Sequence, residues 1–282
     1  MSNREEKVGS IVKVCVLALV VFSLCFVPAC KKSTPQPPPE SPRQQTPDKS
    51  KGDTKNVDIP VPEPTTVKTP DVSKAYDANS AGGSGLVPIE IKLPKPMFVG
   101  TPQDTRVANL EKPLGKLRPP FLAPAGTKNV AFGKPISSSD EEPIIGEIEM
   151  ITDGDKEAAD GSYVELGPFL QYVTIDLEAV YDIYAIVVWH YHKQAQVYFD
   201  VVVQVSDDPD FISNVTTLFN NDIDNSAGFG LGKDMHYTET NEGKLIDAKG
   251  VRARYVRLYS NGNTGNDLNH YIEVEVYGKP VE

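Results

Sequence analysis

The last third of the chain alternates apolar and polar residues in short runs, and each run ends in turn residues. Residues 254–259 alternate strictly, so Val256 and Leu258 share one face of an extended segment and Tyr255 and Arg257 share the other. This period of two is typical of a half-buried β-strand. We therefore expect Val256 and Leu258 to face a core.

A second run closer to the C-terminus has the same period. Ile272, Val274 and Val276 fall on one face, which leaves Glu273 and Glu275 on the opposite face. Such runs recur at short intervals and are separated by turn signals.

Two further runs complete the pattern, and no amphipathic helix of convincing length accompanies them. Residues 172–177 alternate, whereas residues 201–203 are apolar on both faces, as a central strand covered on each side would be. An antiparallel jelly-roll β-sandwich accounts for all of these runs. We assign it to residues 126–282, which is the size of one ordinary domain.

The first 29 residues form a targeting segment. A modestly basic start precedes an apolar run over residues 14–27, and small residues lead to Cys30. This pattern resembles a bacterial lipoprotein signal, which implies a signal peptide over residues 1–29 and lipidation of Cys30. The alternative is one transmembrane helix over residues 11–29, barely long enough for a bilayer that needs about 20 residues. In such lipoproteins an aspartate directly after the cysteine is the pattern for retention in the inner membrane. Here lysines follow Cys30, so we expect an outer-membrane or cell-surface location.

Between this segment and the sandwich the chain is rich in proline. Residues 30–85 contain few apolar side chains and cannot offset the entropy of folding, so we predict a disordered, Pro-rich linker that tethers the domain. Apolar residues return in residues 86–125 among many prolines. This extended segment either docks on the domain or is disordered, and the sequence favours neither. An apolar patch formed by it would favour docking to another protein.

Net charge, cysteine content and the absence of catalytic motifs exclude several classes of function. The net charge of -11 argues against nucleic acid as a partner, because phosphate binding needs a basic surface. Cys15 and Cys25 leave with the signal peptide, so the mature chain holds only Cys30 and forms no internal disulfide. No serine-hydrolase, P-loop or HExxH motif occurs, and we predict that the chain is not an enzyme.

Three strings of residues identify a family. Residues 200–211 (DVVVQVSDDPDF), 253–262 (ARYVRLYSNG) and 271–278 (YIEVEVYG) resemble the discoidin or coagulation-factor C-type domain, also called F5/8 type C, and related galactose-binding-like carbohydrate-binding modules. The resemblance covers about residues 129–278. It implies the same sandwich fold and the binding of ligands without chemistry.

An acidic turn forms the first candidate site. Asp153 and Asp155 flank a glycine, and calcium prefers six to eight oxygen ligands. The spacing of these residues fits an ordinary Asp-Gly turn as well as it fits a calcium site. The resemblance implies a structural calcium between such a turn and the glutamate of the last strand, and this motif matches here at Asp153, Asp155 and Glu273. Much of the coordination in that family is by main-chain oxygens.

The second candidate site follows the run that ends at Trp189. His190 and His192 share one face of a strand end, and Trp189 and Tyr191 share the other. A zinc pair has little support, since no further imidazole is placed beside them. Aromatic and polar groups together suit sugar recognition. For Trp189 we expect packing in the core instead.

The third candidate site is a polar loop over residues 261–270. Its amide side chains either build turns through their own backbone or satisfy sugar hydroxyls. In the resembling family, ligands bind on loops at one end of the sandwich, so we choose Asn263 and Asn269 with His190 and His192 as ligand-binding residues. The leading hypothesis is a surface lipoprotein that binds a glycan or polysaccharide; the alternative is an adhesion or scaffolding module that binds another envelope protein. A lipid-binding route is disfavoured by the acidic balance.

Overall fold

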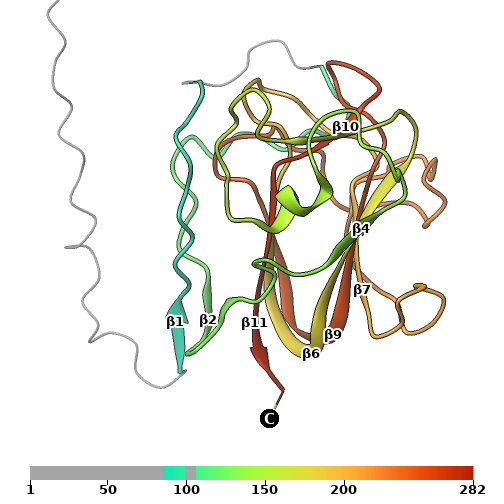
Figure 1. Ribbon diagram of the computed structural model, residues 1–282. Helices are drawn as coiled ribbons and strands as arrows, with labels where there is room; N and C mark the ends of the chain where they lie inside the picture. Colours follow the sequence, from blue (N-terminus) through green and yellow to red (C-terminus); the bar gives the residue numbers. More distant parts are fainter. Residues whose placement is uncertain (1–84, 99–105, 282) are drawn as a thin grey trace, which may run out of the picture. The chain divides into compact units, whose positions relative to one another are not determined.

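Two long strands pair with each other and pass through both layers of a β-sandwich (Figure 1). They are β6 (Gln171–Trp189) and β9 (Lys244–Ser260), and their antiparallel register shifts near the middle. Glu178 and Lys249 adopt positive φ angles of 64° and 55° at this point, and Gly250 follows with 74°. The ribbon therefore bends, so that its two halves belong to opposite layers.

Shorter strands complete both layers, and all pairings within them are antiparallel. The first layer adds β4 (Ile136–Ser138), β7 (Val202–Ser206) and β8 (Thr216–Asn220) to one half of the ribbon. The second layer adds β3 (Lys128–Asn129) and β11 (Glu273–Pro280) to the other half. The predicted all-β sandwich of jelly-roll type is confirmed.

Several small elements lie outside these layers, and three of them are at the same end of the sandwich as the loops described below. They are the 3₁₀ helix η2 (Ile148–Thr152) and the pair β5 (Val164–Leu166) and β10 (Asn269–Tyr271).

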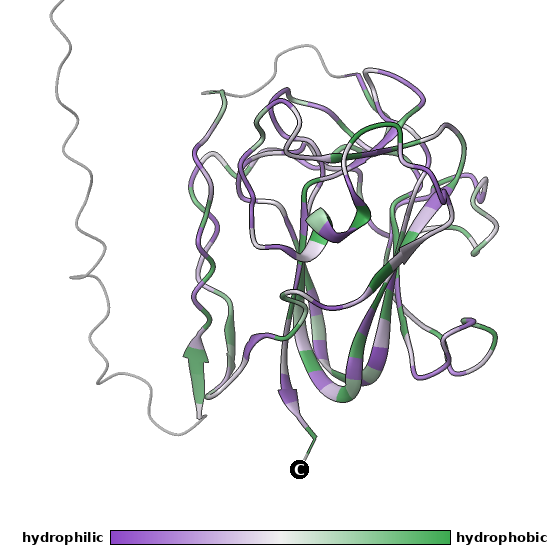
Figure 2. Ribbon diagram, viewed as in Figure 1, coloured by the Kyte–Doolittle hydropathy of each residue, from purple (hydrophilic) through white to green (hydrophobic). Residues whose placement is uncertain are grey.

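The core lies between the layers and follows the predicted alternation. Val256 and Leu258 are fully buried in it, whereas Tyr255 and Arg257 on the opposite face are partly exposed. Figure 2 shows the alternation of hydrophobic and hydrophilic residues along the bent ribbon of β6 and β9. Residues 201–203 are buried, and β7 lies between β8 and β9 as a central strand.

A segment before the sandwich, residues 85–98 and 106–121, covers the outer face of the second layer; we call it the strap. Its start forms β1 (Leu86–Pro88), which pairs with β2 (Leu122–Pro124) just after it. Ile89 of the strap packs with Val187 and Trp189 in a second apolar cluster. Figure 1 shows the strap alongside β11.

The strap changes the environment of two glutamates. The sequence places Glu273 and Glu275 on the face of β11 opposite the core, and both residues do lie there. That face is nevertheless buried, because the strap and the turn after η2 cover it. The Glu275 carboxylate is satisfied by Lys156 Nζ at 2.6 Å and by the Tyr277 hydroxyl at 2.7 Å.

The computed structural model describes residues 85–98 and 106–281, which belong to one unit spanning residues 71–282. The predicted signal peptide, Cys30 and all but the last residue of the predicted linker lie outside the described residues. In the described part, helices long and apolar enough to cross a bilayer are absent.

Candidate functional site

The loops at one end of the sandwich hold every predicted site residue that the structure describes. At this end β6 both starts and finishes, β9 does the same, and β11 begins. We call it the loop end, and it comprises residues 139–170, 190–201, 221–243 and 261–273. The predicted residues within it are Asp153, Asp155, His190, His192, Asn263, Asn269 and Glu273.

Glu273 opens β11 beneath the turn that follows η2. The Gly154 N–H donates to Glu273 Oε2 at 3.1 Å, while Oε1 is buried without a partner among the described residues. Burial penalises the charged carboxylate and raises the pKa of Glu273 to about 9. A buried carboxylate oxygen without a donor is an atom that a cation satisfies well.

The two aspartates of the same turn are exposed and build its backbone. Asp153 Oδ1 accepts the Asp155 N–H at 2.7 Å, and Asp155 Oδ1 accepts the Glu157 N–H at 2.9 Å. Within the described residues these carboxylates do not cluster closely with Glu273. The residues therefore fit a cation in part: Glu273 offers an unsatisfied oxygen, and further ligands have to come from main-chain oxygens of the turn. The calcium stays a prediction.

His190 lies in the interior rather than at the surface. Its Nδ1 is 2.6 Å from Glu239 Oε1, and both side chains are fully buried. The Tyr198 ring stacks on the imidazole at 4.4 Å between centroids, and Tyr271 lies at 4.9 Å. Because residues 237–239 close over the strand end, His190 does not reach a ligand at the surface in this structure.

His192 is buried as well, with Nε2 3.0 Å from the main-chain oxygen of Lys156. It therefore joins the turn after η2 to the end of β6. Trp189 is a core residue as predicted, and its Nε1 donates to the Asn241 carbonyl at 3.0 Å. Tyr191 is partly exposed and packs on Tyr163 with centroids 4.6 Å apart.

The two predicted asparagines build the loops and have no hydrogen-bonding capacity left for a ligand. Asn269 is fully buried; its Oδ1 accepts from Ser260 and Gly262, and its Nδ2 donates to the carbonyls of Gly167 and Phe169. The buried Asn263 is satisfied within residues 263–268 in the same way. The turn-building interpretation of this loop therefore describes both residues in this structure.

Asn269 holds in place a residue that the sequence did not single out. The Phe169 side chain is 79% exposed, and its backbone has a φ of 70°. That conformation is unfavourable for a bulky side chain, and it persists here because the Phe169 carbonyl is fixed by Asn269 at 2.9 Å. The structure thus presents an aromatic ring to solvent on a turn that is hydrogen-bonded to Asn269, and residues 264–267 of the loop that leads to Asn269 are exposed as well.

Three carboxylates that the sequence did not bring together also meet at the loop end. Asp200, Asp222 and Asp224 approach one another closely. Asp222 accepts backbone N–H groups from residues 224–227, and Asp200 accepts from Ser226 and Asn261. These bonds explain the cluster as turn construction.

No protein-family model matches the chain, and a search of curated proteins finds no match. Solved structures do resemble it. One is a family 89 glycoside hydrolase from Clostridium perfringens in complex with 2-acetamido-1,2-dideoxynojirmycin, with 19% identity and a TM-score of 0.40; the match covers 54% of this chain and 15% of that protein.

Two smaller structures match over nearly their whole length. The CBM32 of AlyQ, in complex with 4,5-unsaturated mannuronic acid, is 18% identical with a TM-score of 0.38, and the match covers 51% of this chain and 95% of the module. A Streptococcus pneumoniae fucose-binding module is 16% identical with a TM-score of 0.38, over 53% and 97%. The likeness is one of fold. Both structures are carbohydrate-binding modules, the class that the sequence resemblance named.

The pairing partners at this site could not be read from the sequence. Glu239 is 49 residues from His190, and Glu165 binds His270 at 3.0 Å across 105 residues. Burial lowers the pKa of His270 and outweighs the opposing effect of Glu165. Phe169 carries one local signal, since it follows a Gly-Pro pair that marks a turn.

Proposed function

We propose that this domain binds carbohydrate through its loop end and catalyses no reaction. The observation that carries the proposal is Phe169, an exposed aromatic ring on a strained turn that Asn269 fixes from below. Strain of this kind is often retained where a side chain has a binding role. A ring held rigid also loses little conformational entropy when a ligand covers it.

The chemistry around Phe169 suits a sugar. An aromatic face accepts the apolar C–H face of a pyranose, and hydroxyl, amide and carboxylate groups bond its hydroxyls. Thr264, Asn266 and Asp267 are exposed on the loop that precedes Asn269. Phe169 and this loop replace His190 and His192 as the residues that we expect to contact the ligand.

A structural calcium beneath the loop end is part of the proposal. Glu273 would hold it with main-chain oxygens of the turn that contains Gly154, since Glu273 Oε1 has no hydrogen-bond partner among the residues that the structure describes. Such an ion neutralises the buried carboxylate and stiffens the turn. It supplies stability and no step of a reaction.

The chain is further proposed to be a lipoprotein of the bacterial cell envelope, anchored through Cys30 at the outer membrane or cell surface. The basis is the sequence of residues 1–32 alone. Labelling cells with a lipid precursor tests it: the chain takes up label, and the Cys30→Ala variant does not.

A glycan-array screen of residues 71–282 tests the binding proposal, because this unit contains the whole core. We expect selective binding with calcium, and at least a tenfold loss in Phe169→Ala. Ile212→Ala is the matched control: its side chain is 84% exposed, on the loop between β7 and β8 that lies away from the loop end. A folded protein that binds no glycan, or binding that Phe169→Ala leaves unchanged, would contradict the proposal.

A further inference from the structure

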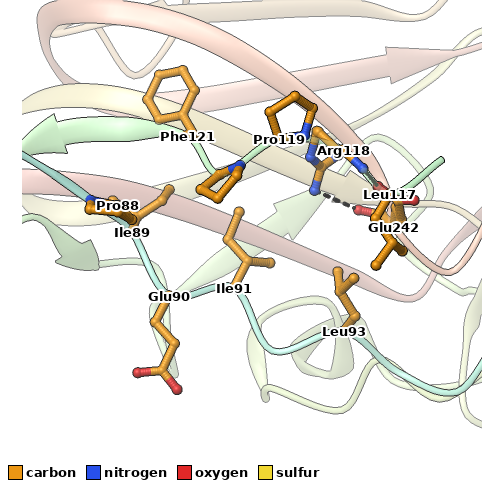
Figure 3. A pocket seen from close by; sticks show the side chains of 11 residues that line it. Pro88, Ile89, Glu90, Ile91, Leu93, Leu117, Arg118, Pro119, Phe121 and Glu242 are labelled. Carbon is orange, nitrogen blue, oxygen red and sulfur yellow. Dashed lines mark hydrogen bonds between the residues drawn. The ribbon is translucent and has the colours of Figure 1, made fainter. Parts of the chain in front are cut away.

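The strap is held rigidly against the sandwich. The Arg118 guanidinium donates to the carbonyls of Glu242 and Gly243 at 3.0 and 2.9 Å, and Asn241 Nδ2 donates to the Pro94 carbonyl at 3.0 Å. Figure 3 shows Arg118 beside Glu242, with Ile91 and Leu93 on the facing leg of the strap. The outward side chains of the strap are therefore presented in a fixed arrangement.

Apolar side chains nevertheless point out from this fixed segment. Leu93 and Met97 are 41% and 42% exposed on one leg, and Leu114 and Leu117 are 58% and 72% exposed on the other. Leu93 and Leu117 line one hollow of about 400 Å³, and Leu114 and Leu117 line a second of about 800 Å³ that shares residues with it. Because the two hollows share Leu117, the side chains of Leu93, Leu114 and Leu117 form one continuous apolar patch, and such a patch marks an interaction surface.

The same segment is basic, although the chain as a whole is acidic. Its described residues contain six cations and two carboxylates, against a net charge of -11 for the chain. Lys92, Lys95, Lys112 and Lys116 are exposed and form no ion pair with another residue of the described part. Lysine and aliphatic side chains alternate along both legs of the strap.

We propose that the strap docks on an anionic lipid surface. Exposed aliphatic side chains enter the interfacial region of a bilayer, and lysines beside them pair with phosphate head groups. A protein partner fits less well, because the cores of protein interfaces are enriched in arginine and aromatic residues and depleted in lysine. The four lysines, which form no ion pair within the described part of the chain, suit a fluid surface of diffuse charge, because a flexible lysine side chain needs no fixed partner there.

This surface differs from the proposed sugar site in its residues. The two hollows at the strap are lined by Leu93, Leu117 and loop-end residues between 237 and 243, whereas Phe169 and residues 264–267 line neither hollow. The strap also reverses the expectation from overall charge, since the negative charge is concentrated in the sandwich and lipid contact depends on the local field.

Cosedimentation of residues 71–282 with vesicles tests the proposal. Phosphatidylglycerol vesicles are compared with phosphatidylcholine vesicles, and folding is checked by circular dichroism. We expect binding to the anionic vesicles only, weakened by raising the salt from 50 mM to 500 mM. The double variant Lys112→Gln, Lys116→Gln should lower partitioning on the order of tenfold.

The control variant removes two exposed lysines of the sandwich, Lys233→Gln with Lys249→Gln, and so changes the net charge equally. Unchanged binding by this control, together with loss in the strap variant, would support the proposal. Equal loss in both variants, or no binding to anionic vesicles by folded protein, would overturn it. Self-association that the strap variant abolishes, without vesicle binding, would overturn it in favour of a protein partner.

Discussion

Replacing Glu273 by glutamine should remove a pH-dependent loss of stability from the protein free of calcium. In the folded chain the pKa of this buried carboxyl is about 9, against a value of 4.5 for an unperturbed glutamate. The folded state therefore retains a proton that the unfolded state releases. The stabilising contribution is complete below pH 4.5 and is lost as the pH rises towards 9.

The size of the effect follows from the two pKa values. Between pH 4.5 and pH 7 only the unfolded chain ionises at this position, so the free energy of unfolding falls by about 3 kcal/mol, at about 1.4 kcal/mol for each pH unit. Glutamine keeps the shape and the acceptor for the Gly154 N–H but cannot ionise. At pH 5 Glu273→Gln should thus match the unsubstituted protein within about 1 kcal/mol, whereas at pH 7 it should be the more stable.

Urea unfolding of residues 71–282 at pH 5, 6, 7 and 8, in the presence of chelator, measures this difference. Glu149→Gln is the control, because Glu149 is an exposed carboxylate on η2. The difference between the Glu273→Gln and Glu149→Gln variants should widen with pH. A constant difference across this range would refute the reasoning about the buried carboxyl.

Calcium should make the unsubstituted protein more stable than Glu273→Gln, the reverse of the order expected without calcium at pH 7. Its binding displaces the proton of Glu273, so millimolar calcium should stabilise the unsubstituted protein more at pH 8 than at pH 6. Glu273→Gln should show no such gain. An equal gain in the variant would place the ion elsewhere.

Two further substitutions test the packing around the loop end and the strap. Gly243→Ala should cost about 2 kcal/mol or more in urea unfolding, because a Cβ there would lie 2.7 Å from the Trp189 ring at a φ of 62°. Gly228→Ala, also at positive φ but in open space, should cost about 1 kcal/mol, and an equal cost in both would exclude the clash. Arg118→Ala removes two bonds to main-chain carbonyls and should speed amide hydrogen exchange in the strap but not in the core, unlike Arg106→Ala at an exposed position. If the Arg118→Ala and Arg106→Ala variants showed the same exchange rates in the strap, the hydrogen bonds of Arg118 would not hold the strap in place.

Local pattern was sufficient for the strands. Val256 and Leu258 face the core because a strand has a period of two, and a strand with one buried face needs its apolar residues on that face. These features depend on neighbouring residues alone, so they could be predicted before the fold was known, along with the sandwich class.

Which polar residues are accessible depends on how distant parts of the chain pack together. His190 and Asn269 lie in polar loops that suggest ligand contacts, yet segments distant in the sequence close over both: Glu239 lies 2.6 Å from His190 Nδ1, and the Gly167 carbonyl accepts from Asn269 Nδ2. Phe169 is the opposite case. A hydrophobic residue is held exposed at the surface by a hydrogen bond to Asn269, which is 100 positions away in the sequence. Burial is a property of the packed chain, and pairs so far apart leave no periodic trace in the sequence. The basic, apolar strap follows the same rule, because its charge matters only once the fold separates it from the acidic sandwich.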